Sequence, residues 1–96
     1  AFREECLLAV VLIPVALLLP VTALERVILI NSVFFLLLTE ILNSAIEATI
    51  DRIGMEVHPL AGRAKDMGSA AVLFALLMGL VAWGFIALPA LAALLG

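Results

Sequence analysis

The chain is a succession of three long apolar segments separated by short polar ones. They cover about residues 6–24, 27–50 and 64–90, and the first contains no charged residue. A helix needs about 20 apolar residues to cross the hydrocarbon core of a bilayer. The pattern therefore predicts an all-α membrane protein, with three membrane-spanning helices in one domain that covers residues 1–96.

Two prolines, Pro14 and Pro20, interrupt the first apolar segment. A membrane helix tolerates proline as a kink when neighbouring groups satisfy the carbonyl that the ring leaves free. Pro20 can instead end the helix, which makes residues 21–24 the turn. Thr22 and Glu25 then have the spacing of a capping box at the start of the second helix.

A polar loop over about residues 51–63 follows the second segment. Gly54 suits a helix C-cap, and Pro59 blocks continuation of the helix. We therefore expect the third helix to begin at Ala61 or Gly62.

The basic residues predict the orientation of the three spans. One side of the membrane receives Arg3, Arg52, Arg63 and Lys65, whereas the other receives only Arg26. Loops rich in lysine and arginine stay in the cytoplasm. The loop at residues 51–63 is therefore expected to be cytoplasmic.

The second segment carries a polar face, made of Glu40, Asn43, Ser44, Glu47 and Asp51. At helical periodicity these residues lie on one side of the helix. A charge at the centre of a span costs about 2.5–3.5 kcal/mol, so this face is expected to turn away from lipid. Its residues would serve as contacts between helices, as an ion or proton path, or as a catalytic or metal-binding site.

Composition restricts the class of protein. The chain has 96 residues, of which 67% are hydrophobic, and its mean hydropathy is +1.36. A water-soluble chain of this length could not bury so much apolar surface. No basic run indicates nucleic-acid binding, and Cys6, the single cysteine, is interpreted as a small apolar residue.

The loop and the start of the third helix supply polar partners for this face. Across a short hairpin, Lys65 and Asp66 should approach Glu47 and Asp51. Carboxylates beside an amide oxygen suit Mg²⁺, and a lysine suits phosphate. Two alternatives stay open, namely that His58 has no role and that the basic residues anchor the helix to anionic headgroups.

Small residues repeat along one face of the third helix, at Gly68, Ala71, Ala75, Gly79 and Ala82. Such a face lets two helices approach closely. We expect it to pack between the subunits of a homo-oligomer that also buries the polar faces. By its depth, Trp83 is expected to fill the core or a subunit contact rather than to anchor the helix at the membrane surface.

Two blocks of sequence resemble the prokaryotic diacylglycerol kinase family: Glu40-Ile-Leu-Asn-Ser-Ala-Ile-Glu-Ala-Thr-Ile-Asp-Arg52 and Gly62-Arg-Ala-Lys-Asp-Met-Gly-Ser-Ala-Ala-Val72. The resemblance extends from Ala1 to about Trp83. It implies a homotrimeric, multi-pass enzyme of the bacterial inner membrane, with three spans per subunit and a site facing the cytoplasm. The implied reaction transfers the γ-phosphoryl group of MgATP to diacylglycerol, giving phosphatidic acid.

The resemblance also implies roles for individual residues. Glu47 matches the catalytic glutamate, which also binds Mg²⁺. The residues that match the nucleotide site are Asn43, Glu47, Asp51, Glu56, Val57, His58, Lys65 and Asp66. Those that match the lipid-substrate site are Ala1, Phe2, Arg3, Glu4, Glu5, Glu40 and Ser69. Val57 stands where the best-known members have tyrosine, so only a backbone contact is expected there.

The family also has an amphipathic surface helix before the first span, which ends in a second Mg²⁺-binding glutamate. That helix would precede Ala1, so the 96-residue chain alone is expected to be impaired as an enzyme. Undecaprenol kinase shares the E-x-x-N-x-x-x-E-x-x-x-D pattern and is the alternative within the family. A small ion- or proton-conducting oligomer and a plain scaffold are the alternatives outside it.

Overall fold

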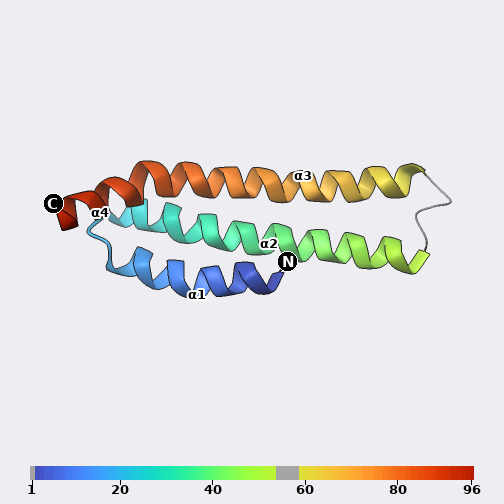
Figure 1. The fold of residues 1–96 in the computed structure, drawn as a ribbon, viewed down its shortest axis with the longest axis horizontal. Coiled ribbons are helices and arrows are strands. Elements are labelled where there is room, and N and C mark those ends of the chain that lie inside the picture. Colours follow the sequence, from blue (N-terminus) through green and yellow to red (C-terminus); the bar gives the residue numbers. More distant parts are fainter. Residues whose placement is uncertain (1, 54–58) are drawn as a thin grey trace.

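The computed structural model describes residues 2–53 and 59–96, apart from the side chain of Phe2. Within these ranges the chain is helical: α1 (Phe2–Leu18), α2 (Ala23–Ile53), α3 (Pro59–Ala82), a π-helical turn η1 (Trp83–Ala87) and α4 (Leu88–Leu95). The last three elements follow one another without a break. Figure 1 shows the resulting elongated molecule, which measures 57 × 20 × 20 Å.

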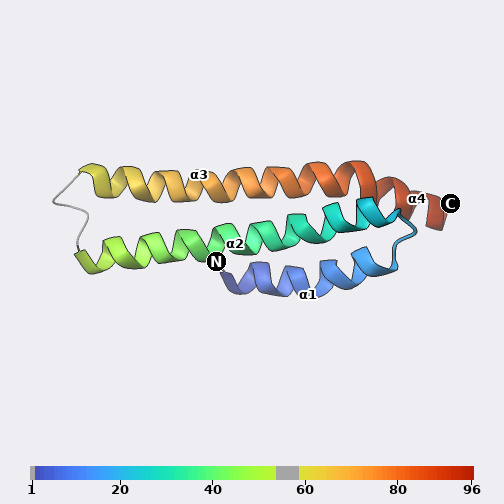
Figure 2. The same cartoon turned by 180° about the vertical axis from the view of Figure 1, so that it is seen from behind.

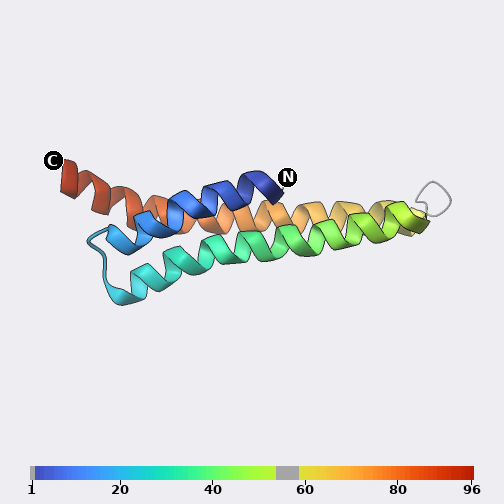
Figure 3. The same ribbon diagram turned by 90° about the horizontal axis from the view of Figure 1, so that it is seen from below.

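The longest of the individual helices, α2, lies in the middle and packs against both α1 and α3 (Figures 1 and 2). Figure 3 shows α1 and α3 on the same side of α2 at the end of the molecule that carries the C-terminus. The 31 residues of α2 span about 46 Å, whereas the 17 residues of α1 span about 26 Å. The N-terminus of α1 consequently lies near the middle of α2, and the α2–α3 hairpin extends beyond it.

Two helical stretches, Ala23–Ile53 and Pro59–Leu95, are long and apolar enough to cross a membrane. Their large apolar side chains are mostly exposed, as at Phe85, which is 81% exposed. The central helix of a soluble protein would bury such side chains. The exposure is therefore consistent with a membrane protein whose helices face lipid.

The turn between α1 and α2 confirms the predicted capping box. The Thr22 backbone N–H donates to Glu25 Oε1 at 2.9 Å, and the Glu25 N–H donates to Thr22 Oγ1 at 3.2 Å. The helix α1 ends at Leu18, two residues before Pro20. The interpretation of Pro20 as the end of the first helix is therefore the correct one.

Arg26 closes the C-terminal end of α1. One guanidinium nitrogen donates to the carbonyls of Ala16 and Leu17, both at 2.7 Å, and the other donates to the carbonyl of Val21 at 3.1 Å. The last carbonyls of a helix have no intrahelical partner. A charged donor on α2 thus satisfies the end of α1 and ties the two helices together.

The predicted start of α3 was wrong by two or three residues. The helix begins at Pro59 rather than at Ala61 or Gly62. Proline suits the first turn of a helix, because an N–H at that position would have no intrahelical acceptor. The end of α2 at Ile53 agrees with the prediction, whereas the predicted cap Gly54 lies outside the described residues.

Part of the small-residue face of α3 is covered within this chain. Gly68, Ala75 and Ala82 are buried, although only this one chain is present. Because α3 packs mainly on α2, the predicted close approach is confirmed for this pair of helices. Packing of this face between subunits stays a prediction, because the structure describes a single subunit.

Candidate functional site

The polar face of α2 is divided by the start of α1. The Glu40 carboxyl is buried and lies within hydrogen-bonding contact of the Glu5 carboxyl on α1. Asn43, Glu47 and Asp51 follow at one-turn intervals beyond this point, on the part of the hairpin that extends past α1 (Figure 1). The deepest polar residue therefore lies at the junction of three helices, and the others lie where only α2 and α3 are present.

An ion pair joins the two helices of the hairpin near its end. Lys65 Nζ on α3 lies 3.0 Å from Asp51 Oδ1 on α2. The lysine side chain is 26% exposed and the aspartate side chain 67%, so the pair is open to solvent. The structure thus confirms the predicted approach of Lys65 to Asp51.

The helices α2 and α3 pack tightly on this face where Gly68 meets Asn43. A Cβ atom at Gly68 would overlap Asn43 Oδ1 and would lie 3.3 Å from Asn43 Cγ. The same oxygen is buried and has no hydrogen-bond partner within the described residues. The glycine therefore allows the Asn43 amide to pack directly against the backbone of α3. The Asn43 Oδ1 atom remains an unused hydrogen-bond acceptor among the described residues.

Glu47 is half-buried between Asn43 and Asp51. Across residues 2–53 and 59–96, it forms no hydrogen bond or ion pair, and neither does Asp66, which is exposed. The structure therefore does not show the predicted contact of Lys65 and Asp66 with Glu47. It leaves the Glu47 carboxylate available to a ligand.

The donor set fits a magnesium ion that arrives with a nucleotide. No cluster of three or more His, Cys, Asp or Glu side chains that could hold a metal occurs in the part of the chain that the structure describes. Mg²⁺ often keeps several waters and binds through one or two carboxylates together with substrate phosphates. The unpaired Glu47 carboxylate meets that requirement, with the spare oxygen of Asn43 one turn away.

The remaining predicted residues lie in three places. Arg3 and Glu4 are exposed at the start of α1, Ser69 is exposed beside Gly68, and Ser44 is exposed on α2. Phe2 begins α1. The following predicted site residues lie outside the described residues: Ala1, Glu56, Val57 and His58.

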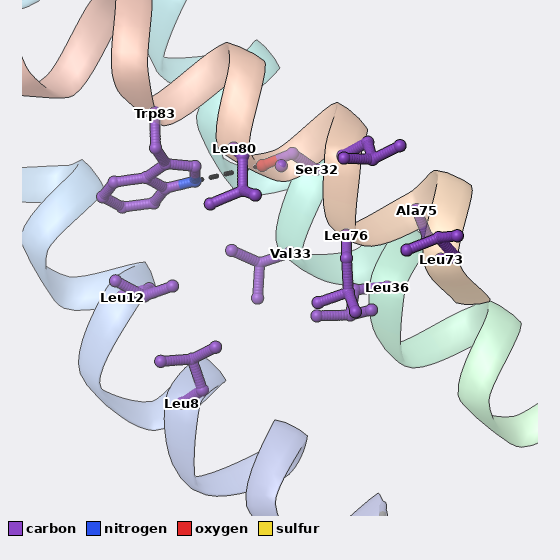
Figure 4. Close-up of a pocket in the computed structure, with 12 residues that line it drawn as sticks. Leu8, Leu12, Ser32, Val33, Leu36, Leu73, Ala75, Leu76, Leu80 and Trp83 are labelled. Atoms are coloured by element: carbon purple, nitrogen blue, oxygen red, sulfur yellow. Dashed lines mark hydrogen bonds between the residues drawn. The ribbon is translucent and has the colours of Figure 1, made fainter.

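Sequence reasoning missed an apolar groove of about 460 Å³ between α1, α2 and α3 (Figure 4). At one end of it, Trp83 Nε1 donates a hydrogen bond of 3.1 Å to Ser32 Oγ, which donates in turn to the Leu29 carbonyl at 2.7 Å. A serine in a helix commonly bonds to its own backbone. Ser32 therefore gave no sequence signal, whereas the core contact of Trp83 was predicted and is confirmed.

Comparison with known proteins identifies the family of this chain. The family profile of prokaryotic diacylglycerol kinase matches residues 1–87. The diacylglycerol kinase of Escherichia coli strain K12 is 53% identical over 83 residues, which are 86% of this chain and 68% of that protein.

Two further relatives have the same name. The diacylglycerol kinase of Haemophilus influenzae is 50% identical over 84 residues, covering 88% of this chain and 71% of that protein. The diacylglycerol kinase of Pseudomonas aeruginosa is 54% identical over 88 residues, covering 92% and 72% respectively. The matched residues contain α1, α2, α3 and the whole polar face, and the chain therefore belongs to the prokaryotic diacylglycerol kinase family.

Proposed function

We propose that this protein phosphorylates diacylglycerol to phosphatidic acid with MgATP, at the cytoplasmic face of the bacterial inner membrane. Family membership supports the lipid class and the phosphotransferase activity. One observation carries the assignment of the site: the free Glu47 carboxylate lies one turn from Asp51, which is paired to Lys65. The excess of basic residues near the α2–α3 turn supports the cytoplasmic orientation.

Glu47 acts on the hydroxyl group of the lipid in this proposal. Its carboxylate orients the hydroxyl and accepts the proton as the oxygen attacks the γ-phosphorus of ATP. The new P–O bond forms, the bond between the γ-phosphorus and the bridging oxygen breaks, and ADP leaves with that electron pair. Such transfer depends mainly on positioning and on neutralisation of charge.

Cationic groups supply that neutralisation. Lys65 faces the phosphates and exchanges its contact with Asp51 for contact with the nucleotide. Glu47 and Asn43 would hold the magnesium ion, whose charge balances the phosphate oxygens when it is bound. Asp66 and the predicted loop residues Glu56, Val57 and His58 complete the nucleotide site.

The glycerol backbone of the lipid is placed at the level of Glu5 and Glu40, and its free hydroxyl extends along α2 toward Glu47. These carboxyl groups meet where the apolar part of α1 ends and the polar hairpin begins, which is where a lipid headgroup would lie. Ser69 and residues 1–4 complete the lipid site. Glu47 lies about 10 Å further along α2, seven residues from Glu40, so the nucleotide occupies the hairpin and the lipid lies below it.

We further propose that α1 forms a third span and that three copies assemble into a homotrimer. The polar face is only partly covered in one chain, since Ser44 and Asp51 are exposed. Neighbouring subunits would cover that face and shield it from lipid.

The experiment compares Glu47→Gln with Glu25→Gln in the full-length protein, using ATP with diacylglycerol or undecaprenol in mixed micelles. Glu25 is a matched control because it caps the distant end of α2. We expect Glu47→Gln to lower turnover of diacylglycerol by about 10²–10⁴-fold, as for loss of a general base. The oligomer should remain intact by light scattering, and Glu25→Gln should stay active.

Two results would refute the proposal. Equal turnover by Glu47→Gln and the wild type would remove Glu47 from the chemistry. Faster turnover of undecaprenol than of diacylglycerol would assign the other lipid as substrate.

A further inference from the structure

The apolar groove shown in Figure 4 is built from all three long helices. Its walls include Leu8 and Leu12 of α1, Leu36 of α2 and Leu73 of α3. The contribution of α3 and the first residue of η1 runs from Leu73 to Trp83, a length of about 15 Å along the helix axis. The groove is therefore elongated, as a single hydrocarbon chain is.

One end of the groove is continuous with the proposed lipid site. Leu8 lies three residues after Glu5 on α1, and Leu36 lies four residues before Glu40 on α2. Residues at these separations are neighbours on one face of a helix. A lipid whose glycerol backbone lies beside Glu5 and Glu40 would thus direct an acyl chain into the groove.

The other end is closed by Trp83. Its indole N–H is occupied by Ser32 Oγ at 3.1 Å, which fixes the ring and leaves its carbon atoms facing the groove. Behind the ring lies the packed core cluster formed by Ala16, Leu19, Leu29, Ala82 and Ala87. A chain that enters beside Glu40 therefore meets a rigid stop.

We propose that this groove holds one acyl chain of the lipid substrate and that Trp83 sets the longest chain it accepts. This inference rests on the proposed function, because the position of the glycerol backbone determines where the chain begins. Each methylene that fits in the groove exchanges contact with membrane lipid for closer packing against the side chains of the groove, and it gains dispersion energy from that packing. Methylenes beyond Trp83 find no further room and gain nothing.

The first test measures kcat/KM of the full-length protein for diacylglycerols of increasing chain length. We expect the value to rise with length and then to level off or fall once the chain reaches Trp83. Trp83→Ala should shift that limit to longer chains and should raise the ratio of kcat/KM for long substrates to that for short ones. Trp83→Phe retains most of the ring and should keep the limit close to that of the wild type.

Phe85→Ala is the matched control, since Phe85 lies in the same turn but is 81% exposed outside the groove. It should leave the chain-length profile unchanged. If Trp83→Ala lowers kcat/KM equally for all chain lengths, Trp83 has only a structural role and the inference is overturned.

A second measurement does not require turnover. Trp83 is the only tryptophan among the 96 residues, and in full-length protein with any tryptophan outside them replaced by phenylalanine its fluorescence reports on the groove directly. Diacylglycerol brominated at the end of its acyl chains should quench Trp83 saturably, and unlabelled diacylglycerol should reverse the quenching. Brominated phosphatidylcholine at the same mole fraction should give only weak, non-saturable quenching. The double variant that combines Trp83→Phe with Phe85→Trp moves the tryptophan outside the groove, and either brominated lipid should quench it only weakly and without saturation.

The two measurements separate the possible failures. Saturable quenching without phosphorylation would refute the proposed function and retain the groove as a lipid site. Normal phosphorylation with equal quenching by both brominated lipids would refute the groove and retain the proposed function. If Trp83→Ala fails to fold, the quenching of Trp83 by brominated diacylglycerol still tests whether the groove binds the acyl chain.

Discussion

Lys65 Nζ on α3 and Asp51 Oδ1 on α2 lie 3.0 Å apart, near the end of the α2–α3 hairpin that extends beyond α1. The pair is exposed on the aspartate side, and surface ion pairs contribute only about 0–1 kcal/mol to stability. Its more important effect is positional, because it holds a cationic group one turn away from Glu47.

Lys65→Met should therefore impair nucleotide use much more than folding. We expect kcat/KM for MgATP to fall at least about 100-fold, since loss of a charged contact with phosphate costs about 3 kcal/mol. The free energy of unfolding should change by less than about 1 kcal/mol. Steady-state kinetics and chemical denaturation measure the two effects, and Arg63→Met, on the exposed side of α3, is the control. Similar losses in both variants would indicate a general charge effect.

Gly68→Ala should destabilise the protein by about 1–3 kcal/mol, because the added methyl group would overlap Asn43 Oδ1 and force the closely packed amide side chain to move. Gly79→Ala is the matched control on the same helix, where a Cβ atom meets nothing within 4 Å. That change should be neutral or stabilising by up to about 1 kcal/mol, from helix propensity. Unfolding in mixed detergent micelles measures both. Equal stability of the two variants would contradict the close approach of Asn43 and Gly68.

Arg26→Gln should detach the end of α1. Three carbonyls lose a charged donor, and we expect a loss of about 2–4 kcal/mol, since each such bond contributes about 1.5–3 kcal/mol and the three share one guanidinium. Limited proteolysis near Pro20 and denaturation measure the effect. Arg52→Gln, exposed in the last turn of α2, should change stability by less than about 0.5 kcal/mol. Unchanged proteolysis of Arg26→Gln would show that α1 is held by apolar packing alone.

Glu40→Gln should affect the lipid rather than the nucleotide. If its carboxyl group holds the glycerol backbone of the lipid, KM for diacylglycerol should rise about tenfold, which corresponds to the loss of one hydrogen bond. KM for MgATP should stay within about twofold, because Glu40 lies about 10 Å from Glu47 along α2. Initial-rate measurements with either substrate varied separate the two effects. A larger change in KM for MgATP would place Glu40 in the nucleotide site.

Several features of the fold were predictable because they depend on residues close in the sequence. Apolar segments of sufficient length predicted the long helices, and the spacing of Thr22 and Glu25 predicted the cap that begins α2. The helical period of α2 placed Glu40, Asn43 and Glu47 on one face. Each of these inferences concerns groups within a few turns of one helix, where backbone geometry alone determines the neighbours.

Tertiary structure decided which of these groups meet groups on other helices. Ser32 and Trp83 are 51 residues apart, and their hydrogen bond depends on the rotation of α2 and α3 about their axes. Arg26 acts on the end of a different helix, and Gly68 packs within the chain because α3 turns that face toward α2. Periodicity shows that a face exists but not which helix covers it, since the sequence pattern contains no information on the rotation, tilt and offset of neighbouring helices. The packing of α1 against α2 brought Glu5 beside Glu40 and buried the Glu40 carboxyl group, a contact between helices that helical periodicity does not specify.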